Sequence, residues 1–332
     1  MDAVSEKPLV VAIVGSTATG KTALALALAQ YLKPWLSSMA VISADSQQVY
    51  RHLEWGTAKP SQMERSALPH YLLDVAEPTE AYSVARYRDA AQQQLLTLMN
   101  HNTLPLVVGG TGFYVRALLE VGGMAPVAPD KELRRRLLAE ALAEGSVALH
   151  ERLKQLDPVR AGQLHPNDQV RIVRALEIIE QTGQPVPQVP LFQPNPQWRI
   201  VWVGLTVANA EWLRQRINDR VDAMLRAGWL QEVEALLERY GPEAHALKVA
   251  HGYPEWMAYV QGQRGFDDAL AQVRLNIHQY ARRQRTWFRR HSAIQWFQVD
   301  CQPLETIATQ VGQQILGHLG LGPLQPELPV TS

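Results

Sequence analysis

Residues 15–22 read Gly-Ser-Thr-Ala-Thr-Gly-Lys-Thr, a G-x-x-x-x-G-K-[ST] pattern whose residue types suit the binding of a diphosphate or triphosphate. Gly15 and Gly20 let the backbone turn so that its N–H groups point at anionic oxygens. Lys21 supplies a cation for the terminal phosphate, and the hydroxyl of Thr22 can ligate Mg²⁺. The pattern predicts a phosphate site, and a plain glycine turn between a strand and a helix is the alternative. The predicted site comprises Gly15, Ser16, Thr17, Ala18, Thr19, Gly20, Lys21 and Thr22.

Two aspartates end short apolar runs and are candidates for acid–base or metal chemistry. Asp45 follows Ile-Ser-Ala at 42–44, and Asp74 follows Tyr-Leu-Leu at 71–73. In a chain with a phosphate loop, a strand that ends in Asp suits a Mg²⁺ ligand. A carboxylate at the carboxyl end of a strand also suits a general base. Spacing favours Asp45 over Asp74 as the magnesium ligand. It does not decide between a magnesium ligand and a general base, and an aspartate that caps the next helix is a third interpretation.

A glycine-rich turn follows the apolar run at 104–108. It reads Gly109-Gly110-Thr111-Gly112 and contains no acid. Glycine allows a ligand to approach the backbone closely, and Thr111 offers a hydroxyl where ligands bind in sheets of this kind. A tight turn from strand to helix explains the same residues equally well.

Residues 274–291 form a basic segment that contains aromatic residues and no acid. Arginine at this density, with aromatic side chains between, is typical of a nucleic-acid surface, and a solvated basic face is the alternative. Arg171 and Arg174 share a helix face by their spacing and extend the basic set. The arginines of the segment are Arg274, Arg282, Arg283, Arg285, Arg289 and Arg290.

The elements that must position these residues alternate between strand and helix over residues 9–120. Short apolar runs separated by helical stretches are typical of an α/β, P-loop NTPase-like fold, a parallel sheet flanked by helices. Predicted strands cover 10–14, 40–43, 71–73, 104–108, 198–205 and 293–299. Predicted helices cover 22–32, 84–99, 112–119, 211–227, 230–240 and 266–291.

A small all-helical domain is expected inside this fold. Residues 131–180 have helical periodicity and no strand-like run, and prolines are frequent over 183–197. We therefore predict a catalytic core at 8–122 and 198–318, an inserted helical domain with a proline-rich linker at 123–197, and a disordered tail at 319–332.

Composition excludes several classes of protein. The chain has 332 residues, 46% of them hydrophobic, and a formal net charge of zero. A single cysteine excludes an intrachain disulfide framework, and no Cys/His spacing suits zinc. No apolar run reaches the ~20 residues of a membrane span, and residues 9–14 are too short for the apolar core of a signal peptide. We expect a soluble cytoplasmic protein with no membrane partner.

Several blocks, taken in order over residues 9–291, resemble the bacterial tRNA dimethylallyltransferases, also called tRNA isopentenyltransferases. No single block is decisive, but their shared order is specific. The matching blocks are the loop at 15–22, Asp-Ser-Gln-Gln-Val-Tyr-Arg at 45–51, Gly-Thr-Ala-Lys-Pro at 56–60, Pro-His-Tyr-Leu-Leu-Asp at 69–74, Val-Gly-Gly-Thr-Gly-Phe-Tyr at 108–114, His-Pro-Asn-Asp at 165–168, and Arg283-Gln284 with Thr-Trp-Phe-Arg at 286–289.

The resemblance implies transfer of a dimethylallyl group from its diphosphate to the adenosine next to a tRNA anticodon. It implies that Asp45 is the general base with Thr111 beside it, that Arg220 joins the phosphate loop, and that Mg²⁺ at Thr22 is the cofactor. Dimethylallyl diphosphate and the tRNA anticodon stem-loop are the expected partners, and we expect a monomer. The tRNA-binding residues implied are Asp45, Ser46, Gln47, Gln48, Arg134, Val170, Arg171, Ile172, Val173, Arg174, Arg283 and Arg289.

The chain departs from the family pattern at two places near these blocks. His251 replaces an aliphatic residue and Pro254 replaces a cation, while His52-Leu53 replaces glycine and a small or apolar residue.

Three other functions fit part of the pattern. They are prenyl transfer to free adenine nucleotides, a P-loop kinase or ATPase, and an RNA-binding protein in which the phosphate loop is only regulatory.

Overall fold

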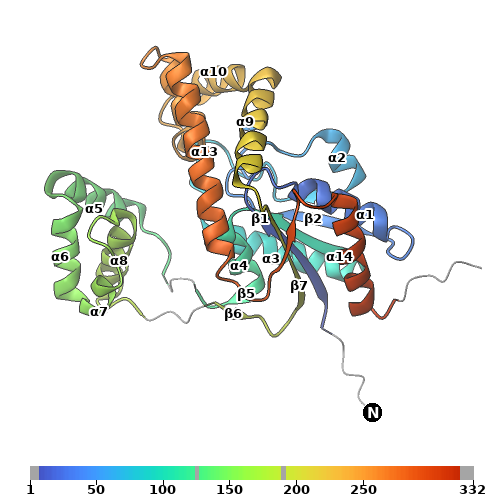
Figure 1. Ribbon diagram of the computed structural model, residues 1–332. Coiled ribbons are helices and arrows are strands. Elements are labelled where there is room, and N and C mark those ends of the chain that lie inside the picture. Colours follow the sequence, from blue (N-terminus) through green and yellow to red (C-terminus); the bar gives the residue numbers. More distant parts are fainter. Residues whose placement is uncertain (1–6, 124–126, 188–191, 322–332) are drawn as a thin grey trace, which may run out of the picture. The chain divides into compact units, whose positions relative to one another are not determined.

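The computed structural model describes residues 7–123, 127–187 and 192–321 and divides the chain into two compact units (Figure 1). One unit is Met1–Glu120 with Pro194–Ser332, and the other is Val121–Gln193. These boundaries lie a few residues from those predicted at 122 and 198. Residues 188–191 of the predicted linker and 322–332 of the predicted tail lie outside the described residues.

The larger unit is built on a six-stranded sheet in which every described strand pair is parallel. The strands are β1 (Leu9–Gly15), β2 (Met39–Ser43), β3 (His70–Tyr71), β4 (Leu104–Gly109), β7 (Arg199–Thr206) and β8 (Gln295–Gln298). Their order is β3-β2-β4-β1-β7-β8, so β1, β4 and β2 are neighbours and end at the same edge. The α/β, P-loop-like fold is confirmed.

Alternation along the strands creates a core on each face of the sheet. Val10, Ala12 and Val14 pack into one core, whereas Val11 and Ile13 pack into the other. The second core is closed by α1 (Lys21–Leu32) and α14 (Leu304–His318), and the first by α3 (Val84–Asn100) and α4 (Gly112–Leu119) among others. Figure 1 shows these two pairs on opposite sides of the sheet.

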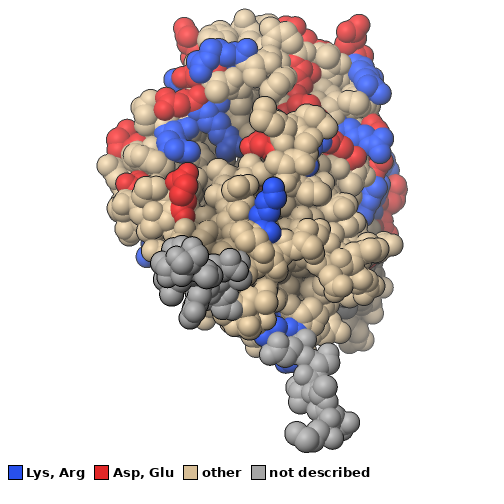
Figure 2. All heavy atoms as spheres, turned by 90° about the vertical axis from the view of Figure 1, so that its right-hand side faces the viewer, with Lys and Arg blue, Asp and Glu red and all other residues tan. Residues whose placement is uncertain are grey.

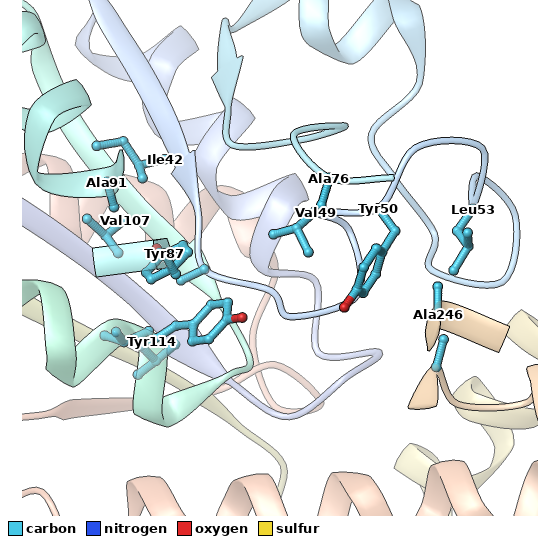
Figure 3. Close-up of a cluster of buried hydrophobic side chains, with 14 of the residues drawn as sticks. Ile42, Val49, Tyr50, Leu53, Ala76, Tyr87, Ala91, Val107, Tyr114 and Ala246 are labelled. Carbon is cyan, nitrogen blue, oxygen red and sulfur yellow. The ribbon is translucent and has the colours of Figure 1, made fainter. Parts of the chain in front are cut away.

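The loop after β2 rests on a buried aromatic cluster (Figure 3). Tyr87 of α3 and Tyr114 of α4 stack with ring centroids 4.0 Å apart. Val49, Tyr50 and Leu53 are each 2% exposed or less and anchor the loop to this cluster. The chain after Asp45 is therefore fixed by packing.

A second group of helices completes the larger unit. The predicted helices appear as α9 (Ala210–Ala227), α10 (Trp229–Tyr240) and α13 (Phe266–Phe288), the last ending three residues before its predicted end. The sequence did not predict α2 (Gln62–Ala67), α11 (His245–Val249), α12 (Tyr253–Val260) or α14.

The smaller unit is helical around its own core. Its helices are α5 (Lys131–Glu144), α6 (Ser146–Leu156), α7 (Pro158–Gly162) and α8 (Gln169–Thr182). Leu137, Leu153, Ile172 and Leu176 form the centre of that core. β5 (Glu120–Val121) and β6 (Gln193–Pro194) pair where the chain passes between the units.

Candidate active site

The larger unit contains a cavity of about 300 Å³ at the carboxyl ends of β1, β2 and β4. Ligands bind at this edge in open parallel sheets, where neighbouring strands leave the sheet in different directions. Three charged residues that were predicted for the active site line the cavity. They are Lys21 of the phosphate loop, the candidate base Asp45, and Arg220 of α9. The structure thus brings the phosphate loop and the candidate base to one site.

The phosphate loop presents only part of its predicted residues to the cavity. Ser16 and Thr19 are buried behind the loop, where the hydroxyl of Thr19 donates to the carbonyl oxygen of Ser16 at 2.9 Å. Gly15 also lies outside the lining because it packs against β7, where a Cβ would lie 2.5 Å from the carbonyl oxygen of Leu205. Thr17, Ala18, Gly20, Lys21 and Thr22 form the lining.

The cations of the cavity lie close enough to repel one another. Burial and, to a smaller extent, the nearby Arg220 lower the pKa of Lys21 to about 8, while Asp45 opposes the shift. Burial also lowers the pKa of Arg220, against the attraction of Asp45. The ammonium of Lys21 donates to the carbonyl oxygens of Gly15 and Ser16 at 3.1 and 2.8 Å. An anion with several oxygens would relieve this concentration of positive charge.

Asp45 combines a local structural role with a free oxygen. Its Oδ1 accepts hydrogen bonds from the backbone N–H groups of Gln47 and Gln48 at 2.9 and 3.3 Å. Within the described residues Oδ2 has no hydrogen-bond partner, and the residue lines the cavity. The turn-forming role and the catalytic role are therefore compatible, because they use different oxygens of one carboxylate.

Thr111 links the turn after β4 to the segment that carries Asp45. Its Oγ1 accepts from the backbone N–H of Ser46 at 2.9 Å and donates to the Ser46 hydroxyl at 3.3 Å. Thr111 thus contacts the residue that follows Asp45, although Thr111 itself does not line the cavity. The side chain of Gln48 does line it, but its amide donates to the carbonyl oxygens of Thr57 and Ala58.

The glycines after β4 make room for protein atoms, and one of them, Gly109, also lines the cavity as expected for a close approach of a ligand. A Cβ on Gly109 would lie 2.1 Å from the carbonyl oxygen of Ala44. A Cβ on Gly112 would lie 2.1 Å from the ring of Trp287. The close packing of β4 against β2 and α13 therefore requires these glycines.

Asp74, the rival candidate for the magnesium ligand, is held by two cations. Its oxygens pair with Lys59 at 2.5 Å and with Arg65 at 3.2 Å. Its own φ of +56° places it in a turn rather than at the end of a regular strand. Asp74 does not line the cavity and stabilises the loop around Lys59 instead.

The residues present fit a magnesium ion bound together with a diphosphate. The described residues contain no group of three acidic, His or Cys side chains suited to a metal. Mg²⁺ in phosphate sites usually takes one or two protein ligands and completes its shell with phosphate oxygens and water. The hydroxyl of Thr22, which lines the cavity, supplies one such ligand and leaves the free oxygen of Asp45 available as a base.

Five arginines of the predicted basic segment have no carboxylate partner among the described residues. Arg274 differs because it pairs with Asp222 at 2.5 Å. Figure 2 shows positive and negative side chains interspersed over the face it presents. A basic surface for nucleic acid therefore depends on which individual arginines lack a nearby carboxylate. The unpaired arginines are Arg282, Arg283, Arg285, Arg289 and Arg290 of α13 and the turn after it.

The predicted RNA contacts of the smaller unit divide into exposed and buried residues. Ile172 and Val173 are 0% and 2% exposed in the core, so contact of these two side chains with tRNA is excluded. Val170 and Arg171 are exposed. Arg134 and Arg174 both pair with the fully buried carboxylate of Glu177, at 2.6 and 2.9 Å. They neutralise that charge and stabilise the unit.

His251 and Pro254, which depart from the family pattern, have clear structural settings. His251 lines the cavity, and its ring lies 4.1 Å from that of Tyr280. Burial lowers the pKa of His251, and Arg283 adds to the shift while Asp45 opposes it. Pro254 occupies the first turn of α12, where proline is tolerated because its missing N–H has no partner there in any helix.

Sequence reasoning missed several residues that shape the cavity. Arg216 of α9 was not a predicted ligand, and its Nε donates to the carbonyl oxygen of Ala18 at 3.1 Å. Glu232 of α10 accepts from the backbone N–H groups of Glu54 and Trp55 at 2.7 and 2.9 Å and so holds the loop before Lys59. One of three glutamates in an amphipathic helix gives no signal of this role.

Among the described residues no helix is both long enough and apolar enough to cross a membrane.

A family model described as IPP transferase matches residues 48–291. A tRNA dimethylallyltransferase of Symbiobacterium thermophilum is 43% identical over 305 residues, 91% of this chain and 93% of that protein. The full-length tRNA isopentenylpyrophosphate transferase of Bacillus halodurans matches with a TM-score of 0.68 and 35% identity, over 95% of this chain and 97% of that chain. A eukaryotic dimethylallyltransferase acting on tRNA matches with a TM-score of 0.75 and 25% identity, over 96% of this chain and 81% of that one. On this combination of motifs, cavity and relatives, the chain belongs to the IPP transferase family.

Proposed function

We propose that the protein transfers a dimethylallyl group from dimethylallyl diphosphate to N6 of the adenosine that follows the anticodon in tRNA. One observation carries the proposal: the free carboxylate oxygen of Asp45 shares a cavity with the cation-rich phosphate loop. The names of the relatives support the same reaction. A monomer acting in the cytoplasm, where unmodified tRNA is available, is part of the proposal.

The chemistry forms a bond between N6 and the allylic carbon while the bond from that carbon to the diphosphate oxygen breaks. An adenine amine is a weak nucleophile because its lone pair is delocalised, so Asp45 accepts the N6 proton during attack. Lys21, Arg220 and the N–H groups of the loop stabilise the charge on the departing diphosphate. Mg²⁺, when bound, adds positive charge to that leaving group. The target base must leave its stack to enter the cavity.

Product analysis tests the proposal directly. Unmodified tRNA is incubated with dimethylallyl diphosphate and Mg²⁺, and its nucleosides are analysed by mass. The gain of one dimethylallyl group on the adenosine after the anticodon is expected. Equal turnover of AMP would favour the free nucleotide as acceptor. Hydrolysis of ATP without prenyl transfer would favour a kinase or ATPase, and tRNA binding with neither reaction would favour an RNA-binding protein.

Binding of the diphosphate should weaken as the pH rises above about 8. Lys21 has a lowered pKa of about 8 in the free protein, and a bound diphosphate favours its charged form. Affinity is therefore constant below that pKa and falls by up to about tenfold per pH unit above it. Titration calorimetry with dimethylallyl diphosphate alone, between about pH 7 and about pH 9.5, covers a range in which the ligand's own phosphate ionisation is nearly complete.

Lys21→Arg is the matched control for this titration, because arginine stays charged over the whole range. Its affinity curve should be flat. A flat curve for the unaltered protein would show that Lys21 does not titrate against the ligand.

Arg283 and Arg289 should contribute to tRNA affinity through phosphate contacts. Both are exposed and lack a carboxylate partner among the described residues. We expect the double variant Arg283→Gln/Arg289→Gln to bind tRNA more weakly and to flatten the plot of log affinity against log salt by about one unit per arginine. Binding is measured over a series of salt concentrations.

The control is Arg239→Gln/Arg264→Gln, which removes the same charge from exposed positions outside α13. It should leave the salt slope unchanged. Equal slopes for the two double variants would assign α13 a merely solvated basic face.

A further inference from the structure

Gln284 is a buried polar residue on a helix whose neighbouring side chains face solvent. It is 5% exposed, whereas Arg283 before it is exposed. Its Oε1 accepts from the backbone N–H of Thr17 at 2.8 Å, and its Nε2 donates to the carbonyl oxygen of Gly110 at 3.0 Å. The backbone N–H can only donate and the carbonyl can only accept, so the partners fix the orientation of the amide. One side chain thus joins the phosphate loop to the turn after β4.

The backbone of the turn is adapted to this amide. A Cβ on Gly110 would lie 2.1 Å from Nε2 of Gln284, closer than any side chain tolerates. Any other residue at 110 would displace the amide. Glycine at this position therefore has a specific physical reason, which is the close approach of the Gln284 side chain to the turn.

The two segments joined by Gln284 carry the two halves of the reaction. The phosphate loop carries Lys21 on the leaving-group side. The turn carries Thr111, which holds the backbone N–H of Ser46 next to Asp45 on the acceptor side. The distance between leaving group and base thus depends on the Gln284 bridge, and an error of about 1 Å in such a distance can cost about 100-fold in rate.

We propose that Gln284 is a positioning residue that sets the phosphate loop against the Asp45 side of the cavity. This role rests on the proposed prenyl transfer. Gln284 lines the cavity, but both polar atoms of its amide are engaged by Thr17 and Gly110, so in this role it contacts neither reacting atom and contributes when both substrates must be aligned. The amide acts through the backbone of Thr17 and Gly110, so its effect should appear in kcat rather than in the binding of either substrate alone.

The test replaces the amide by an apolar side chain of similar length. We expect Gln284→Met to lower kcat by about 10–100-fold. The KM for dimethylallyl diphosphate and the Kd for tRNA should each change by less than about threefold, since their own contacts remain. Gly110→Ala displaces the same amide from the other side and should give the same change in kcat.

Combining the two changes tests whether they act on one bridge. The double variant should lose no more than either single variant, because the bridge can be removed only once. Gln279→Met, an exposed glutamine on the same helix, is the control and should keep the normal kcat. Thermal unfolding of every variant separates loss of folded protein from loss of rate per folded molecule.

Two results would overturn the role of Gln284 while the unaltered protein is active. One is a kcat for Gln284→Met within about twofold of normal, and the other is a raised KM for dimethylallyl diphosphate with kcat unchanged. If Gln284→Met does not fold, a normal kcat for Gly110→Ala overturns it equally. Absence of transfer by the unaltered protein would overturn the proposed function itself, and the role of Gln284 with it.

Discussion

Asp45→Asn is expected to lower the kcat of prenyl transfer by about 10²–10⁴-fold and to leave the affinity for tRNA unchanged. Asparagine keeps an Oδ1 that can accept from the N–H groups of Gln47 and Gln48, so the turn after β2 is preserved. What it loses is the second carboxylate oxygen as a proton acceptor. Single-turnover rates with bound dimethylallyl diphosphate and tRNA measure this step apart from binding and product release.

Asp74→Asn is the natural comparison, because Asp74 is the other aspartate that follows an apolar run. Its carboxylate pairs with Lys59 and Arg65 away from the cavity, so we expect lower thermal stability and a nearly normal kcat per folded molecule. A normal rate for Asp45→Asn would remove Asp45 from the role of base. A large loss of rate for Asp74→Asn would reopen the choice between the two.

The phosphate loop could be predicted because its signal is local. One short stretch contains the apolar run of β1, the two glycines of the loop and the start of α1. Each of these three features favours the same strand–loop–helix geometry. β3 shows where a local signal misleads. Tyr71-Leu72-Leu73 is apolar enough for a strand, but Leu72 and Asp74 adopt positive φ, so the strand ends at Tyr71.

Two of the four helices that were not predicted differ in the signal that the sequence contains. α12 begins with Gly-Tyr-Pro, which resembles a turn, yet proline is compatible with the first turn of a helix. α14 carries apolar residues at helical spacing that pack on the sheet, so its pattern was available in the sequence.

The roles of buried polar residues could not be predicted, because they depend on partners far along the chain. Gln284 lies 267 residues from Thr17, and its neighbours in sequence are an exposed and a partly exposed arginine. Arg134 and Arg174 were predicted to bind RNA, and only the structure shows that both also pair with the buried Glu177. Net charge and helical spacing cannot distinguish an arginine that binds an internal carboxylate from one that is free for RNA.

Arg220→Met is expected to lower kcat/KM for dimethylallyl diphosphate by about 10²–10³-fold, the usual cost of losing one donor to a developing anion. Burial lowers the pKa of Arg220, Asp45 opposes the shift and the nearby Arg216 adds to it, so this partly desolvated guanidinium should attract the leaving diphosphate strongly. Arg220→Lys should recover only part of the loss, because an ammonium lacks the paired donors of a guanidinium. Steady-state kinetics at saturating tRNA measure all three proteins.

Arg214→Met, on the same helix, removes an exposed arginine that pairs with Glu211 at 3.0 Å and should leave kcat/KM unchanged. How the loss divides between kcat and KM then identifies what Arg220 does. A loss mainly in kcat means that Arg220 binds the diphosphate most tightly as it departs, whereas a loss only in KM means that it binds substrate and transition state equally. Because charge on the diphosphate increases as the allylic bond breaks, and because Arg220 faces the cavity beside Lys21, the larger part should appear in kcat.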